Sequence, residues 1–421
     1  MKLPIAITII IISHSLVAQD TLRYETVLEM GATHSPRMAD RELIDRQGAL
    51  ALENVQRNWY PELMLNGKAT YQSDVVSIEI DQPGFSLDFP EMPHEQFGIN
   101  LDVRQNIYDG GFSKQKKKYE ELSTAVSLKQ VETDIYTLKS RLSELYFSAL
   151  LLQENRKNLE IALDNLRARE QVLVSSVKNG VAEENDLKVI RVEILKLRQS
   201  LSELESGKNG LLGMIRVYTG MEPGTPVLLT SPGIEAETGS EVRRKELELL
   251  DLQSELIEIG KSLKSVQRMP RIYAFGQAGI GMPGYNMLSD QVSPYYMVGA
   301  GVQWKIWDWN TTSREKQIME SRKQVVAHSR ETFSIQINAR IENELKKLAH
   351  YRDAVALDRE MLELRREITR NAASKLDHGV INATEYLQVL NDENMARVKL
   401  TTDQVRLART QAEYQMIKGN L

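Results

Sequence analysis

Hydrophobic residues recur at alternating steps of three and four along one long stretch of the chain, from residue 128 to residue 177. Thirteen of the fifteen positions in this series are apolar, and only Arg156 and Glu170 are charged. The spacing predicts a coiled-coil helix over about 112–178, which at a rise of about 1.5 Å per residue is on the order of 100 Å long. No proline falls within it to break the helix.

The end of this helix carries the residues of a helical hairpin turn. Asn179 and Gly180 are suited to cap a helix C-terminus, and Asn185 is suited to cap the start of a return helix over about 185–218. We therefore predict two antiparallel helices joined at Gly180.

A second pattern, with period two, precedes the long helix. Phe97, Ile99, Leu101 and Val103 alternate with polar residues, as expected of a strand with one apolar face and one polar face. The predicted strand pairs cover about 61–72 with 96–108, and about 271–281 with 295–307. Aromatic residues flank them, as in the membrane-interface girdles of transmembrane barrels: Trp59, Tyr60, Tyr108, Trp304, Trp307 and Trp309.

The chain repeats itself at a shift of 199 residues, which places Val103 on Val302 and Gly180 on Gly379 without a gap. Both halves have the order short helix, strand, strand, long helix, glycine turn and return helix. We predict a first repeat over 19–220, a connector over 221–240 and a second repeat over 241–421, with helices over about 312–376 and 384–418. Where the first half has Gly110-Gly111, the second has Trp309-Asn310, so we expect a different turn there.

The composition narrows the class of protein. The net charge is −5, with charges of both signs interleaved, and the chain has no cysteine. These values argue against nucleic-acid binding, disulfides, zinc clusters and lipid attachment at a cysteine. The first twenty residues, MKLPIAITIIIISHSLVAQD, predict an export signal over 1–18, cut after Ala18 or Gln19.

The sequence shows no group of residues typical of an enzyme active site. The stretch GIGMPG at 279–284 fits G-x-G-x-x-G in form, but it leads into a predicted loop instead of a helix. The histidines are scattered and form no HExxH motif. We predict a protein that is not an enzyme, with no catalytic residue, cofactor or metal site.

The alternating strands have two interpretations. One is a soluble sandwich with one wet face. The other is a membrane sheet; four strands cannot close a barrel, and open sheet edges are not stable in lipid, so several copies must then pool their strands. An α+β membrane protein follows, in which helical hairpins form a periplasmic α-barrel and four strands per protomer join a shared transmembrane β-barrel.

At this point the sequence resembles the TolC-like outer membrane efflux proteins (outer membrane factors). The resemblance rests on NWYPELMLNG (58–67), VRQNIYDGG (103–111), KNGVAEENDL (178–187) and DHGVINATEYL (377–387), in this order. It implies a homotrimer in the cell outer membrane with a long periplasmic extension. It also implies a passive exit duct in efflux or type I secretion, with a periplasmic adaptor (membrane fusion) protein and an inner-membrane pump of RND, ABC or MFS type.

The resemblance also implies functional residues. Acidic side chains just inside the glycine turns ring the closed periplasmic end in the family; the matching positions here are Glu385, Gln388 and, in the first half, Asp186. Simple stabilisation of a helix N-terminus is the alternative role for both carboxylates. The tips that would meet adaptor hairpins are Gly180, Val181, Gly379 and Val380.

The sequence leaves the cargo and the adaptor open. The alternative function is a periplasmic coiled-coil adaptor or scaffold that does not span the membrane, which would not need aromatic-flanked alternating strands.

Overall fold

The computed structural model describes residues 20–76, 80–82, 85–87, 92–224, 227–234, 241–286 and 289–421. The predicted export signal over 1–18 lies outside these residues, as do parts of the predicted connector. The chain forms two compact units, each built from segments of both predicted repeats.

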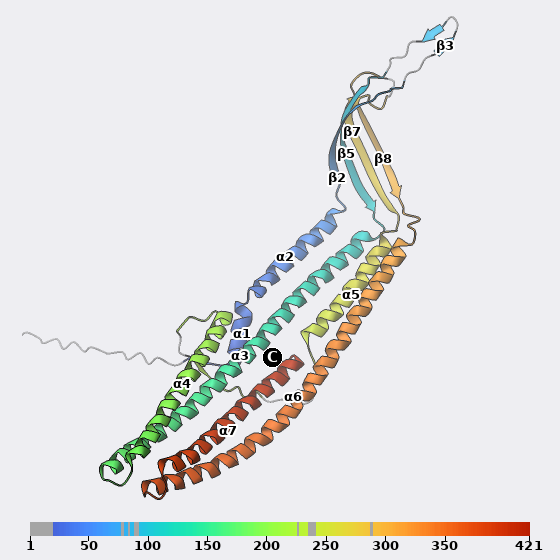
Figure 1. Cartoon of the computed structure of the whole chain (residues 1–421). Helices are drawn as coiled ribbons and strands as arrows, with labels where there is room; N and C mark the ends of the chain where they lie inside the picture. Colours follow the sequence, from blue (N-terminus) through green and yellow to red (C-terminus); the bar gives the residue numbers. More distant parts are fainter. Residues whose placement is uncertain are drawn as a thin grey trace, which may run out of the picture. The chain divides into compact units, whose positions relative to one another are not determined.

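The first unit is mainly helical and comprises Met1–Ala39, Glu132–Lys245 and Ile335–Leu421. Two helical hairpins dominate it (Figure 1). It contains α1 (Tyr24–His34), α4 (Glu184–Thr219), α7 (Ala383–Lys418) and most of α3 (Phe112–Lys178) and α6 (Thr311–Asp377). The corresponding helices of the two halves are equal in length, with 67 residues in α3 and α6 and 36 in α4 and α7.

Most of the apolar series that predicts α3 lies in this unit, and its central members are buried. Leu142, Ala149 and Leu166 are each at most 1% exposed. The two charged positions of the series form ion pairs with α4, because Arg156 lies 3.1 Å from Glu205 and Glu170 lies 2.7 Å from Arg191. The two charged residues of the series therefore link α3 to α4, the two helices of the first hairpin.

An aromatic cluster forms the centre of the same unit. Tyr24 of α1 packs against Tyr146 and Phe147 of α3, with ring centroids 5.5 and 5.3 Å away. The Tyr24 hydroxyl donates to Ser143 Oγ at 3.0 Å. A parallel pair of strands, β1 (Asp20–Leu22) and β6 (Val227–Leu229), adjoins this cluster. Neither α1 nor this strand pair is predicted from the sequence.

This burial leads to a prediction for alkaline pH. Burial raises the pKa of Tyr24 to about 12, against an ordinary value of 10.0. Because the unfolded chain ionises first, stability is full below pH 10 and is lost as the pH rises from about 10 to 12, by about 3 kcal/mol. Thermal unfolding followed by circular dichroism at pH 9 and pH 11.5 should show this loss. In Tyr24→Phe the loss should be smaller, and an equal loss would contradict the assignment.

The second unit, Asp40–Val131 and Glu246–Ser334, contains the large sheet. Four antiparallel strands follow the order β2-β5-β7-β8 (Figure 1). The unit also contains α5, most of α2 and a short pair, β3 with β4. The bounds are β2 (Glu62–Tyr71), β3 (Ile80–Gln82), β4 (Phe85–Leu87), β5 (Glu95–Tyr108), β7 (Arg271–Met282), β8 (Ser293–Gln303), α2 (Pro36–Arg57) and α5 (Lys245–Val266).

The last strand is shorter than the sequence predicts. It ends at Gln303, whereas the alternation continues to 307. Gln303 pairs with Arg271, the first residue of β7, and Pro270 before it has no N–H to extend the ladder. The strand therefore ends where its partner does.

The junctions from strand to long helix are alike, contrary to our expectation. Trp309 and Asn310 have φ of 55° and 60°, close to the 70° and 85° of Gly110 and Gly111. Both turns are held by an aspartate before them. Asp109 accepts from Ser113 N at 2.8 Å, and Asp308 accepts from Thr312 N at 3.1 Å. The expectation of a different turn was wrong, because these caps impose the left-handed backbone on tryptophan as well as on glycine.

Candidate functional site

One face of the four-stranded sheet is apolar, and most of its side chains are exposed in the part of the chain that the structure describes. The register places the odd-numbered residues of β5 beside matching apolar residues of β2 and β7 and, through β7, of β8. Leu65 is 74% exposed and Val298 is 77% exposed. The face comprises Leu63, Leu65, Ala69, Phe97, Ile99, Leu101, Val103, Ala278, Ile280, Tyr296, Val298, Ala300 and Val302.

The opposite face carries the polar side chains. Asn66 donates to Asp102 at 2.5 Å, and the Arg104 guanidinium lies 4.0 Å above the ring of Tyr273. In a water-soluble protein the apolar face of a sheet is covered by the core. Here the arrangement suits an apolar environment on one side of the sheet and water on the other.

Both outer strands of the sheet have an open edge. Among the described residues β2 pairs only with β5, and β8 pairs only with β7. An open edge leaves backbone N–H and C=O groups without partners, which is unstable in lipid. A membrane location therefore requires pairing with further strands.

The predicted interface aromatics gather at one end of the sheet, where β2 begins and where β5 and β8 end. Trp307 and Trp309 contact each other edge to face, with ring centroids 5.9 Å apart. All six are more than a third exposed: Trp59, Tyr60, Tyr108, Trp304, Trp307 and Trp309.

The two hairpin turns of the helical unit share one backbone design. Gly180 and Gly379 have φ of 73° and 69°. Val181 N donates to Ser176 O, and Val380 N donates to Lys375 O, which closes each helix end. Val181 and Val380 are 65% and 69% exposed at the tips.

The N-cap of each return helix lies three residues after the glycine of its turn. It is Glu183 for α4 and Asn382 for α7. The prediction of Asn185 as the first cap was wrong. The glycine turn fixes the distance to the cap, and applying the 199-residue repeat to Asn382 would have identified Glu183.

The three predicted acidic-ring positions lie near these caps. Glu385 forms a capping box with Asn382, and its carboxylate accepts from Asn382 N at 3.2 Å. Asp186 accepts from Ala383 N at 3.1 Å, which joins the start of α4 to the start of α7. Gln388 is exposed on α7. Both carboxylates thus have a structural role at a helix N-terminus.

A further contact between the hairpins is not visible in the sequence. Arg169 of α3 donates to both carboxylate oxygens of Asp377 at 2.6 Å, and its guanidinium lies 5.8 Å from the ring of Tyr386. Burial raises the pKa of Tyr386. Because Arg169 and Asp377 lie about half the chain apart, no pattern within a single segment of the sequence could predict that they meet.

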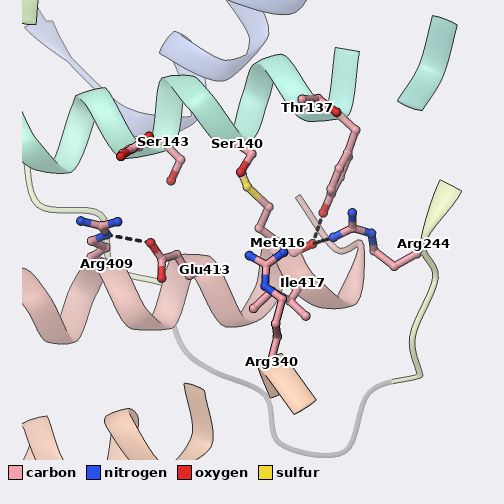
Figure 2. A pocket seen from close by; sticks show the side chains of 11 residues that line it. Thr137, Ser140, Ser143, Arg244, Arg340, Arg409, Glu413, Met416 and Ile417 are labelled. Atoms are coloured by element: carbon pink, nitrogen blue, oxygen red, sulfur yellow. Dashed lines mark hydrogen bonds and ion pairs between the residues drawn. The ribbon is translucent and has the colours of Figure 1, made fainter. Parts of the chain in front are cut away.

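A cavity of about 360 Å³ lies elsewhere in the helical unit, between α3 and α7 (Figure 2). Arg244 and the Tyr136 hydroxyl both donate to the Met416 carbonyl, and Arg409 pairs with Glu413 at 2.7 Å. The Tyr136 contact fixes the last turn of α7 against α3. We interpret the cavity as part of the packing of the C-terminal turn.

Among the described residues, every helix is too short or too polar to cross a membrane.

Comparisons with known proteins identify the fold. No protein-family model matches the chain, and no curated protein matches it in sequence. Solved structures do match. A CusC structure, from work on its folding and transmembrane channel formation, has a TM-score of 0.71 at 12% identity, covering 94% of this chain and 91% of its own.

Two further structures agree. The outer membrane protein VceC from Vibrio cholerae has a TM-score of 0.69 at 12% identity, with 94% of this chain and 96% of VceC covered. The CmeC outer membrane channel of Campylobacter jejuni has a TM-score of 0.68 at 13% identity, with 94% and 85% covered. The chain therefore has the fold of TolC-type outer membrane channels, which confirms the resemblance found in the sequence. The trimeric shared barrel and the internal repeat remain predictions.

Proposed function

We propose that this chain is the subunit of an outer membrane channel that serves as a passive exit duct. The observation that carries the proposal is the sheet, which has a bare apolar face, a polar face and two open edges. A closed barrel in lipid makes all three features favourable. The structures that share the fold include an outer membrane channel, which supports the same function; that the chain is not an enzyme remains a prediction.

The number of strands in a closed barrel determines how many copies of the chain assemble. Three copies with four strands each give twelve strands, in which every β8 edge can pair with the β2 edge of the next copy. The exposed aromatics at one end of the sheet would then lie in the membrane interface. The helical hairpins of three copies would line a periplasmic tube, and an export signal over 1–18 fits this location.

Partners would meet the duct at its helical tips. Val181 and Val380 project from capped turns and are available to a periplasmic adaptor, which would connect the duct to an inner-membrane pump. The duct itself does not need to be selective for its cargo. The same channel could therefore serve an efflux system or a type I secretion system.

Single cysteines test the placement of the sheet, because the chain has no cysteine of its own. We expect a membrane-impermeant maleimide to label Asn66→Cys, on the water-filled side, at least about tenfold faster than Leu65→Cys, on the lipid side. The two positions are adjacent on β2, so they lie at nearly the same depth along the strand and differ only in the face of the sheet. Equal labelling of both in intact outer membranes would contradict the proposal.

A ring of Glu385 at the periplasmic end of the tube is a further part of the proposal. Glu385→Gln keeps an oxygen that can accept from Asn382 N but removes one charge per chain. We expect the cation-over-anion permeability ratio to fall at least about twofold in planar bilayers, because carboxylate rings favour cations.

The control for this change is Glu363→Gln on α6, whose carboxylate is paired with Arg366 at 2.7 Å. It should leave the ratio unchanged. If Glu385→Gln also leaves both the ratio and the conductance unchanged, Glu385 is a helix cap and no more.

A further inference from the structure

The polar face of the sheet has aromatic rings at three positions, and each ring lies opposite a glycine on the neighbouring strand. The register pairs Tyr273 with Gly301, Phe275 with Gly299 and Tyr295 with Gly279. A Cβ added at Gly301 would lie 2.5 Å from Tyr273 Cζ, and one at Gly299 would lie 2.7 Å from Phe275 Cζ. The rings therefore lie flat across the next strand, in space that only glycine leaves open.

Arg104 completes one of these arrangements. Its guanidinium lies 4.0 Å over the Tyr273 ring, so that Gly301, the ring and the guanidinium form a stack. Glu62 lies directly opposite in the register, yet within the described part of the chain Arg104 forms no ion pair. Among the described residues, the contact made by the guanidinium is with an aromatic face and not with a carboxylate.

The chemistry of this stack favours one class of ligand. Arg104 is exposed, so the outer side of the guanidinium is accessible. A guanidinium binds carboxylates with two parallel hydrogen bonds and stacks on flat groups. The Phe275 ring, 6.2 Å from Tyr273 between centroids, adds aromatic surface beside it.

We propose that Arg104, stacked on Tyr273 over Gly301, is a binding site for planar aromatic carboxylates on the inner wall of the channel. The site rests on the proposed function, in which the polar face lines the water-filled duct. Three copies would place three such sites around the axis.

Block of ionic current by benzoate tests the site with the purified, assembled protein in planar bilayers. Benzoate should reduce the current at about tenfold lower concentration than acetate or benzyl alcohol, since each of these offers only one of the two contacts. Arg104→Gln should raise the half-blocking concentration of benzoate about tenfold. Arg104→Lys should give an intermediate value, because lysine keeps the charge but not the flat stack.

Two matched controls separate the stack from general charge and from strand damage. Lys68→Gln removes another positive charge from the same face and should change the block by less than about twofold. Gly301→Ala displaces the ring that carries Arg104 and should weaken the block. Gly299→Ala makes the same chemical change two residues away, displaces Phe275 and should weaken it less.

The outcomes are distinguishable. Equal effects of Arg104→Gln and Lys68→Gln, or equal block by benzoate and acetate in a conducting wild type, would overturn the site and leave the channel intact. A wild type that forms no pore would overturn the proposed function, and the wall site with it.

Discussion

Leu65→Arg should prevent the chain from assembling in the outer membrane. Leu65 lies in the middle of β2, on the bare apolar face, and is 74% exposed. An arginine facing lipid near the bilayer midplane costs about 2 to 4 kcal/mol per chain, and a trimer would carry three. We expect assembled protein in outer membrane fractions to fall at least about tenfold, measured by quantitative immunoblotting without boiling.

The neighbouring residue provides the control. Asn66→Arg places the same side chain on the polar face, beside Asp102, which already accepts from Asn66. It should assemble at close to the wild-type level. If Asn66→Arg fails and Leu65→Arg assembles, the apolar face does not meet lipid and the orientation of the sheet is wrong.

Val181→Asp combined with Val380→Asp should abolish export while leaving the channel assembled. Both valines are exposed at turns whose backbone is closed by glycine caps, so a charge there does not disturb the helices. A charge in the centre of an apolar contact with an adaptor is left unpaired and typically costs several kcal/mol. Export-dependent resistance of cells carrying the double variant should fall to that of cells without the protein.

The double variant Val181→Thr with Val380→Thr has the same shape without charge, and should keep most of the resistance. Assembly of each variant is checked by its mobility as a trimer. Normal resistance in the doubly charged variant would show that the adaptor contacts another part of the tube.

Local periodicity accounts for most of what the sequence predicts. The seam of Leu142, Ala149 and Leu166 repeats every few residues, and α3 runs from Phe112 to Lys178 as the spacing indicates. The alternation around Ile99 likewise predicts β5. Such patterns can be recognised because the same spacing of buried and exposed positions repeats many times within one element.

Single long-range contacts are not visible in this way. β1 pairs with β6 over three residues only, and Arg169 meets Asp377 from the opposite half of the chain. Backbone conformation can also override residue preference. Asp308 caps α6 and holds Trp309 in a left-handed turn, although glycine is the residue that favours it.

Electron microscopy of the full-length protein, extracted from outer membranes in detergent, would show whether the chain forms a channel. We expect end views with threefold symmetry around a central hole, because three four-stranded sheets must close one barrel. Particles that are recovered in water without detergent and show no pore would contradict it, and would point to a periplasmic adaptor or scaffold instead.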